Sequence, residues 1–225
     1  MSAIDPVLLN IAAQIVRLGD VVWDIGANVG LFSFAAAAMA GPRGKVFSFE
    51  PDAWLVQLLR NSARDQTASI APVTVIPVAV ASDISLRTFL IARRSRAANA
   101  LLGYGSKQAD AVDEQQTVPA YSVDWLLERL PAPNVLKIDV EGAEVEVLAQ
   151  QKELFTAARP LIFCEVSAEN SPEITRILKA ADYRLYDARL TGYRATDTAT
   201  WNTLAVPADK LSIYSALDRD SQHCR

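Results

Sequence analysis

The chain has 225 residues, of which 51% are hydrophobic and 21% are charged. This composition predicts a folded chain with a sizeable core, and we expect one domain over residues 1–225. With 22 basic and 26 acidic residues, the net charge of −4 argues against a non-specific nucleic-acid-binding protein. Neither a secretory signal nor a membrane-length apolar run is recognisable, so we expect a cytoplasmic protein with no membrane or nucleic-acid partner.

The first predicted element is a helix within residues 1–19. Asp5 and Pro6 provide a cap and a first-turn proline, apolar residues follow at helical spacing, and Gly19 ends the pattern.

The next stretch predicts a strand, a tight turn and a helix. An apolar run from Val21 leads to Gly26, Asn28 and Gly30. Neither the Gly-x-Gly-x-x-Gly pattern of a dinucleotide site nor the Gly-Lys-Ser/Thr of a phosphate loop is present. A glycine turn before a helix can still bring backbone N–H groups to a carboxylate, and Asp24 at the strand end suits an ammonium group. The turn therefore favours a ligand with an amino-acid end over one with a pyrophosphate.

A second strand-like run ends at Phe49-Glu50-Pro51. An acidic residue about twenty residues beyond the glycines is placed to accept hydrogen bonds from both ribose hydroxyls. Glu50 and the glycine turn together predict an adenosine ligand without phosphates, and S-adenosylmethionine is the common cofactor of that kind. The alternative is a plain βαβ crossover with a surface glutamate.

Strands and helices then alternate as in a parallel α/β sheet that is covered on both faces. A helix is expected over residues 52–64 and a strand over residues 73–76. Ligands of such sheets bind over the carboxyl ends of the strands. This places Asp24, Glu50 and the loop at residues 79–83 on one rim.

The alternation stops at Ile84. Residues 85–91 and 115–121 predict short strands, and the segment between them has no clear periodicity. We therefore expect residues 92–113 to form a lid or substrate loop. Its arginines either neutralise an anionic group or form a solvated turn; they are Arg93, Arg94 and Arg96.

A fourth apolar strand begins near Asn134 and runs into three carboxylates, Asp139, Glu141 and Glu144. A lysine inside an apolar strand is costly without a partner, so Lys137 is predicted to pair with one of these acids, and it shares a strand face with Asp139. A purely structural cluster at a helix start is the alternative, although Asp139 has no evident capping role.

The remaining elements complete the alternation. We expect a strand over residues 159–167 that includes Glu165, a helix from Ser171, a short strand over residues 183–186 and a last strand over residues 200–206. Residues 208–225 are expected to form a C-terminal tail.

Three motifs occur in order: residues 23–30, residues 49–51 and residues 137–144. With these motifs the chain resembles the FkbM family of S-adenosylmethionine-dependent methyltransferases. The resemblance implies an α/β class I (Rossmann-like) methyltransferase fold, with a seven-stranded, mostly parallel sheet, an antiparallel last strand and helices on both faces. It also implies methyl transfer to an oxygen, commonly a hydroxyl of a sugar or natural product.

The resemblance also implies roles for individual residues. The methionine end of the cofactor would be held by Asp24, Gly26, Asn28 and Gly30. Glu50 would bind the ribose, and the loop near Ser82 and Asp83 would bind the adenine. Gln150, Gln151 and Asp182 depart from glycines that are usual in the family, which puts details of the substrate loops in doubt.

Methyl transfer to a hydroxyl requires alignment of the acceptor and a group that removes its proton. The single histidine, His223, lies in the tail. A carboxylate is therefore predicted as the base, with Asp139 as the first candidate, Glu165 as the second and Lys137 as the supporting cation. The acids could instead bind Mg²⁺, so the metal question stays open.

The leading interpretation is a methyltransferase that acts on a hydroxyl of a small molecule, sugar or other glycan, or natural product. The first alternative is an NAD(P)-dependent reductase, which the broken glycine pattern disfavours. The second is a non-catalytic nucleotide-binding module of the same fold, which the carboxylate cluster disfavours. The sequence leaves open the acceptor, the methylated position and whether the protein forms a homo-oligomer.

Overall fold

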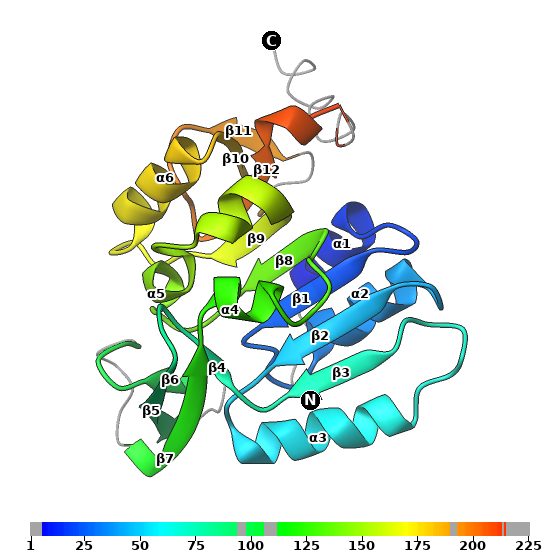
Figure 1. Ribbon diagram of the computed structural model, residues 1–225, viewed down its shortest axis with the longest axis vertical. Coiled ribbons are helices and arrows are strands. Elements are labelled where there is room, and N and C mark those ends of the chain that lie inside the picture. Colours follow the sequence, from blue (N-terminus) through cyan, green and yellow to red (C-terminus); the bar gives the residue numbers. More distant parts are fainter. Residues whose placement is uncertain (1–5, 94–97, 106–111, 190–192, 213, 215–225) are drawn as a thin grey trace.

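The structure is a computed structural model that describes residues 6–93, 98–105, 112–189, 193–212 and 214. These residues form a main sheet with helices on both faces and a smaller sheet beside it (Figure 1). No helix in this part of the chain has both the length and the hydrophobicity needed to cross a membrane.

Within the described residues, the main sheet has eight strands in the order β11-β10-β12-β9-β8-β1-β2-β3. Their bounds are β1 Val21–Ile25, β2 Lys45–Phe49, β3 Val73–Ile76, β8 Val135–Ile138, β9 Leu161–Glu165, β10 Tyr183–Asp187, β11 Arg194–Thr196 and β12 Asn202–Pro207. β3, β2, β1, β8 and β9 run parallel to one another, whereas β12 is antiparallel to both β9 and β10. The expected antiparallel last strand is therefore confirmed.

The strand count differs from the expected seven because β11 adds a short edge strand that pairs with β10. Its three residues, Arg-Ala-Thr, are largely exposed, so they carry no apolar pattern that would reveal a strand.

Helices cover both faces, which explains why the central strands are apolar throughout. The helical elements are α1 Pro6–Ile15, α2 Leu31–Ala40, α3 Ala53–Arg64, α4 Val123–Leu127, α5 Glu144–Leu148, a π-helix at Leu154–Ala158, α6 Ser171–Ala180 and a 3-10 helix at Ala208–Lys210. Val22 and Val135 pack with α1 and α2, whereas Trp23 and Leu136 pack with α4, α5 and α6.

The N-terminal helix ends at Ile15, four residues before Gly19. The start of the expected tail is packed, since Tyr214 is buried beside α1.

The smaller sheet interrupts the alternation between β3 and α4. Its strands are β4 Ala79–Val80, β5 Ser85–Ala92, β6 Ala100–Leu101 and β7 Val112–Tyr121, in the order β4-β7-β5-β6. β5 and β7 form a long antiparallel pair, and β6 lies inside the segment expected to be a loop. The strands expected over residues 85–91 and 115–121 are confirmed as parts of β5 and β7. Their pairing as a hairpin is not evident from the sequence, because exposed apolar residues on β5, such as Leu86 at 74% exposure, obscure the alternation.

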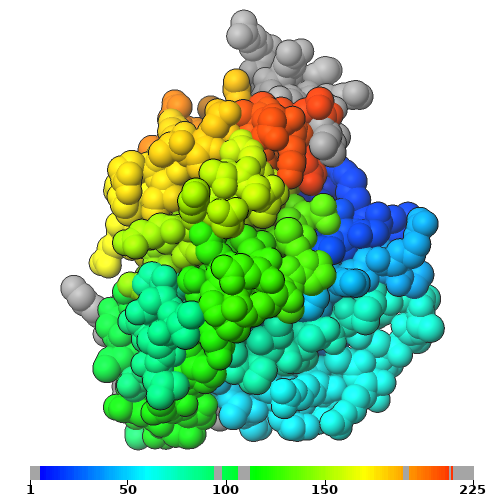
Figure 2. All heavy atoms as spheres, in the orientation of Figure 1, coloured from blue at the N-terminus to red at the C-terminus, as the bar shows by residue number. Residues whose placement is uncertain are grey.

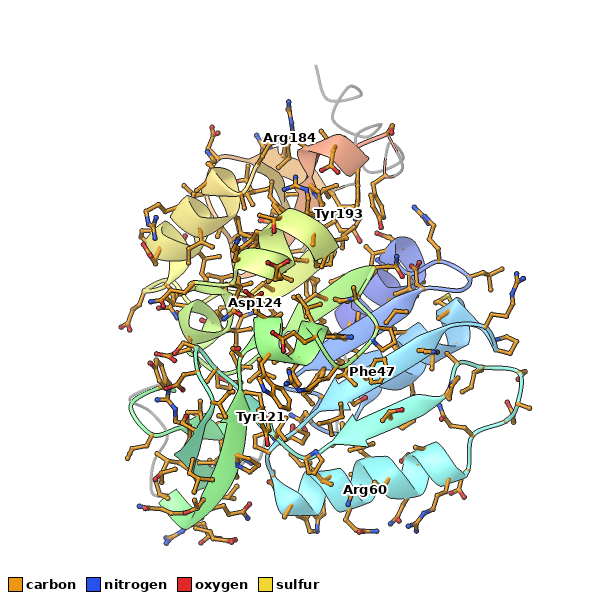
Figure 3. All side chains as sticks on the ribbon, in the orientation of Figure 1. Phe47, Arg60, Tyr121, Asp124, Arg184 and Tyr193 are labelled. Carbon is orange, nitrogen blue, oxygen red and sulfur yellow. The ribbon has the colours of Figure 1, made fainter. Side chains whose placement is uncertain are left out.

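The smaller sheet is joined firmly to the rest of the molecule. Phe89, Leu101 and Val118 form a core that also includes Ala143, next to α5. At the end of β7, Tyr121 stacks on Trp125 of α4 with ring centroids 4.3 Å apart; Figure 3 labels Tyr121 beside α4. In the space-filling view the atoms of this sheet are continuous with the main body, at the lower left of Figure 2.

Candidate active site

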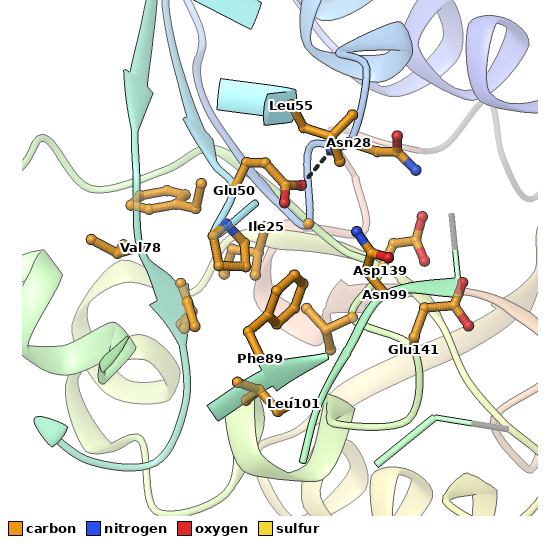
Figure 4. Close-up of a pocket in the computed structure, with 16 residues that line it drawn as sticks. Ile25, Asn28, Glu50, Leu55, Val78, Phe89, Asn99, Leu101, Asp139 and Glu141 are labelled. Atoms are coloured by element: carbon orange, nitrogen blue, oxygen red, sulfur yellow. Dashed lines mark hydrogen bonds between the residues drawn. The ribbon is translucent and has the colours of Figure 1, made fainter. Parts of the chain in front are cut away.

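A pocket opens at the carboxyl ends of β1, β2 and β8, where the smaller sheet meets the main sheet. It encloses about 590 Å³, a volume that includes solvent space at its open mouth. Figure 4 shows apolar side chains on one side and polar side chains on the other. The apolar side includes Ile25, Val78, Phe89 and Leu101, and the polar side includes Asn28, Asn99, Asp139 and Glu141. The pocket therefore suits a ligand with an apolar ring at one end and polar groups at the other.

The turn after β1 forms one wall of the pocket, as expected. Gly26 and Gly30 have φ values of 74° and 87°, and Asn28 between them has a φ of 52°. A Cβ atom on Gly26 would overlap the backbone oxygen of Asp139, so only glycine allows β1 and β8 to end this close together. Gly30 begins α2 without a capping side chain, which leaves N–H groups at the helix start for a ligand.

Asp24 lies behind this turn. It is fully buried, its Oδ2 accepts a hydrogen bond from Ser33 Oγ at 2.6 Å, and its Oδ1 lies 3.1 Å from Lys137 Nζ. Asp24 is not among the described residues that line the pocket. Its expected contact with a ligand ammonium stays a prediction, and in this geometry its charge acts on the pocket through Lys137.

Lys137 joins the two strand ends. Its Nζ donates to the backbone oxygen of Gly26 at 2.8 Å and lies 3.3 Å from Asp139 Oδ2. The predicted pairing of Lys137 with one of the nearby acids is thereby confirmed. Burial opposes the charge of this lysine, but the carboxylates of Asp24 and Asp139 raise its pKa above the usual value. Lys137 is therefore a buried cation shared by both halves of the site.

Glu50 lies at the base of the pocket with 4% exposure. Its two oxygens accept hydrogen bonds from the backbone N–H groups of Asn28 at 2.8 Å and Asp52 at 2.9 Å. Burial raises its pKa to about 7, although both hydrogen bonds act in the opposite direction. Asn99 extends this network from the smaller sheet, because its Nδ2 donates to Asp52 Oδ2 at 2.9 Å. Glu50 is thus placed as expected for a ribose-binding residue, and that role stays a prediction.

The structure does not bring Ser82 and Asp83 into the pocket. Ser82 Oγ donates to Glu146 at 2.6 Å, and Asp83 forms an ion pair with Arg87 at 2.8 Å. The wall at this point consists of Val78, Ala79 and Val80 instead. The adenine role expected of Ser82 and Asp83 therefore has no support from the geometry.

Phe89 and Leu101 are pocket residues that the sequence did not reveal. They are directly opposite each other in the β5–β6 pair. Their signal was apolar character, of residue 89 just before the segment expected to be a loop and of residue 101 inside it. Arg93 forms an ion pair with Asp113 at 3.6 Å, and Arg94, Arg96 and His223 lie outside the described residues.

The predicted bases occupy different places. Asp139 lines the pocket with 25% side-chain exposure, whereas Glu165 is not among the described lining residues. Glu165 follows Cys164, the register partner of Ile138, so it lies one strand beyond Asp139. Both roles stay predictions.

Glu141, to which the sequence assigned no chemical role, also lines the pocket. Its pKa is raised to about 7, first by burial and then by the charges of Asp139 and Glu144. Glu144 is a structural neighbour, since its oxygens accept from Gly142 N at 2.7 Å and from Asn170 Nδ2 at 2.6 Å. Across the described ranges, no group of three or more potential metal ligands is arranged to hold an ion, so the suggested Mg²⁺ site has no support.

The chain was compared with known proteins. It is 31% identical over 166 residues to the hexuronic acid methyltransferase AglP of Haloferax volcanii, a match that covers 72% of this chain and 62% of that protein. Among solved structures, it is similar to the methyltransferase FkbM of Methylobacillus flagellatus KT, with a TM-score of 0.53, 15% identity and coverage of 88% and 49% of the two chains. It is also similar to Aeropyrum pernix fibrillarin in complex with S-adenosylmethionine, with a TM-score of 0.51, 13% identity and coverage of 88% and 74%.

The two structural matches, at these low identities, show the fold. The sequence comparison goes further, because residues 24–185 match the methyltransferase FkbM domain, and this range includes the glycine turn, Glu50 and the carboxylates after β8. The chain belongs to the FkbM methyltransferase family.

Proposed function

We propose that this protein transfers the methyl group of S-adenosylmethionine to a hydroxyl oxygen of a sugar or sugar-containing molecule. Family membership supports methyl transfer. The hexuronic acid acceptor of the relative from Haloferax volcanii supports a sugar as the acceptor class. Because this chain spans only 62% of that relative's length, a hexuronic acid is a first acceptor to test.

The main observation in support of the cofactor is the burial and hydrogen bonding of Glu50. Its carboxylate is buried at the base of the pocket, and each oxygen is fixed by one backbone N–H group. A carboxylate oxygen has more than one acceptor position, so both oxygens can still accept from a ribose diol. The apolar wall at Val78 and Phe89 fits an adenine ring, and a negative residue at the base disfavours a phosphate. The residues therefore fit an adenosine ligand without phosphates.

The residues of the two turns have separate tasks in this proposal. When bound, S-adenosylmethionine supplies a methyl group attached to a positively charged sulfur. A nucleophilic oxygen can bond to the methyl carbon and displace the sulfur. The turn at Gly26–Gly30 binds the methionine end through backbone groups, and the acidic side of the pocket favours a cationic sulfur. Lys137 holds Gly26 and Asp139 in fixed positions, so little ordering is needed when the reactants arrive.

An oxygen acceptor agrees with the groups at the pocket. Carboxylates line the polar side, and a carboxylate can remove a hydroxyl proton during the transfer. From the sequence, Asp139 and then Glu165 are the proposed bases, with Lys137 as the supporting cation. Cys164 is fully buried and its pKa is raised well above the usual value, so it is no nucleophile in this reaction.

Calorimetry with S-adenosylhomocysteine and NADH tests the cofactor, with binding of the first and not the second expected. Transfer of labelled methyl from S-adenosylmethionine to methyl β-D-glucuronide, methyl β-D-glucoside and a panel of other sugars tests the acceptor. Binding of NADH without S-adenosylhomocysteine would replace the proposal with the reductase interpretation. Binding of S-adenosylhomocysteine without transfer to any sugar would overturn the acceptor class.

A further inference from the structure

We infer that Glu141 is the catalytic residue that accepts the proton of the acceptor hydroxyl, and that Asp139 is a positioning residue beside it. This inference rests on the proposed methyl transfer. It replaces the bases suggested by the sequence, which were Asp139 first and Glu165 second.

The first argument is position. Glu141 lies in the turn between β8 and α5, and Figure 4 shows it on the polar side of the pocket with Asp139 and Asn99. The turn around it is tightly held. Glu144 accepts from the N–H of Gly142 at 2.7 Å, and a Cβ atom on Gly142 would lie 3.1 Å from the backbone nitrogen of Gly105. A carboxylate on such a turn is presented to the pocket by a rigid frame.

The second argument is availability. The neighbouring carboxylates are engaged: Glu50 and Glu144 accept two hydrogen bonds each, and Asp139 contacts Lys137. Within the described part of the chain, by contrast, the carboxylate of Glu141 makes no hydrogen bond or ion pair. A partly buried carboxylate without an internal partner gains a hydrogen bond when an acceptor hydroxyl enters.

The third argument is the backbone. Glu141 has a φ of 49°, in the left-handed region where a residue with a Cβ atom is disfavoured and glycine is not. The same conformation occurs at Gln150, Arg159 and Asp182, which do not line this pocket, so it supports a functional role for Glu141 only in combination with the position of its side chain. Strained residues of this kind concentrate at functional sites.

The charges around Glu141 suit a base at neutral pH. Burial opposes the ionisation of Glu141 most strongly, Asp139 after β8 and Glu144 on α5 oppose it as well, and Lys137 favours it, so that its pKa is raised to about 7. Burial also raises the pKa of Glu50, at the base of the pocket, to about 7. Tyr104, from the segment packed on this turn, donates to Glu146 and is not directed at Glu141. A base with a pKa near the working pH combines the correct charge with adequate proton affinity.

The reaction balances with these groups. The O–H bond of the acceptor breaks and its proton passes to a carboxylate oxygen of Glu141. The oxygen lone pair forms the bond to the methyl carbon, while the carbon–sulfur bond of the donor breaks and leaves its electron pair on sulfur. The products are the methyl ether, a neutral thioether and protonated Glu141, which returns its proton to solvent.

The test compares Glu141→Gln with Asp139→Asn, using methyl β-D-glucuronide or the best acceptor of the sugar panel at saturating S-adenosylmethionine. Glu141→Gln should lower kcat by roughly a hundredfold or more with unchanged affinity for S-adenosylhomocysteine. The parent is expected to show a decline of kcat below about pH 7, and Glu141→Gln should abolish this decline. Asp139→Asn should lower kcat less and move that decline to lower pH, because the Asp139 charge raises the pKa of Glu141.

Two further variants guard against a folding artefact. Glu141→Gly relieves the left-handed backbone, so it should melt at or above the parent temperature and still be inactive. Glu169→Gln removes an exposed carboxylate from the loop before α6 and should leave kcat unchanged.

If the parent is active, parental kcat in Glu141→Gln would overturn the inference. A larger loss of kcat in Asp139→Asn than in Glu141→Gln would overturn it as well. So would a tenfold or greater weakening of S-adenosylhomocysteine binding in Glu141→Gln, because Glu141 would then be a ligand for the donor. A parent that methylates no sugar would instead overturn the proposed function, and the inference would fall with it.

Discussion

The turns after β1 and β8 both lead a parallel strand into a helix at the same edge of the sheet, but they are built differently. In the first turn, Gly26, Asn28 and Gly30 have positive φ values, and the adjoining carboxylate of Glu50 is held by two N–H groups. In the second, Glu141 and Gly142 have positive φ values, and among the described residues the carboxylate of Glu141 has no hydrogen-bond or ion-pair partner.

This difference suits the first turn to binding the cofactor and the second to proton transfer. A binding turn gains from being complete before its ligand arrives, because less freedom is then lost on association. A turn that exchanges a proton must keep one group available for the substrate. Lys137 connects the two turns, since it contacts Gly26 in the first and Asp139 in the second.

The largest effect is expected where the turns touch. Gly26→Ala places a Cβ atom against the backbone oxygen of Asp139 and should lower the free energy of unfolding by on the order of 4 kcal/mol or more. Gly19→Ala is the matched control, because Gly19 has a φ of 88° but nothing within 4 Å of an added Cβ atom. Its cost should be only the backbone strain, about 1–2 kcal/mol. Equal losses in chemical denaturation would contradict the close approach of the two turns.

Lys137→Met removes the cation that both turns share. It leaves the buried carboxylate of Asp24 without its counter-charge and should cost about 3–5 kcal/mol of stability. Adding Asp24→Asn to this variant should recover part of the loss, since the uncompensated charge is then removed. Lys45→Met, on the exposed start of the neighbouring strand, should change stability by less than about 0.5 kcal/mol. If the Lys45 variant loses as much, the buried pair is not the cause.

Glu50→Gln alters the binding turn alone. Loss of the charged acceptor should weaken S-adenosylhomocysteine binding by about 1–3 kcal/mol, as measured by calorimetry against Glu169→Gln. In the parent, binding should weaken as pH falls through about 7, because protonated Glu50 accepts hydrogen bonds from the ribose less well. A parental affinity in Glu50→Gln would place the ribose site elsewhere.

The raised pKa of Glu50 also predicts how the free energy of unfolding changes with pH. Burial raises the pKa of Glu50 from 4.5 in the unfolded chain to about 7 in the folded one. The folded protein therefore keeps a proton over this interval that the unfolded chain releases, so the free energy of unfolding falls as pH rises from 4.5 to about 7. Glu50→Gln should lose this part of the decline, while the Glu141 contribution persists.

Tyr104→Phe should have the smallest effect and concerns only the second turn. It removes the hydrogen bond from Tyr104 to Glu146 Oε1, 2.8 Å long, and should cost about 0.5–1.5 kcal/mol or less. Hydrogen exchange should quicken over residues 98–105 and stay unchanged in β1. Tyr193→Phe is the control, because the buried Tyr193 hydroxyl has no hydrogen bond in the described structure. Protection of residues 98–105 equal to that of β1 in the parent, and insensitive to ligand, would exclude a lid.

The sequence predicted those parts of the site that depend on local pattern. Lys137 and Asp139 are two residues apart on one strand, so their shared face follows from strand geometry, and they do meet. The second partner, Asp24, could not be predicted, because it depends on β1 and β8 being neighbours with Asp24 opposite Lys137. That pairing joins residues more than a hundred positions apart, and no local signal specifies its register.

Two other features of the site cannot be recognised from the sequence: the pocket lining near Ser82 and Asp83, and the backbone conformation of Glu141. The adenine role that the resemblance implies for Ser82 and Asp83 stays a prediction, and the residues that line the pocket near them are Val78, Ala79 and Val80. The left-handed conformation of Glu141 was hidden because glutamate gives no indication of it, whereas Gly26 and Gly30 revealed the first turn by residue type.

The smaller sheet contributes to the pocket but is separate from the strands of the main sheet. It enters the chain between β3 and α4, and it supplies Phe89, Asn99 and Leu101 to the pocket without sharing a strand with the main sheet. Its hairpin can therefore be lengthened, shortened or exchanged between relatives while the hydrogen bonding of the eight central strands is left intact. Chimeras that exchange residues 84–92 and 112–118 would change the hairpin while keeping Asn99 and Gly105, which contact Asp52 and the turn around Glu141.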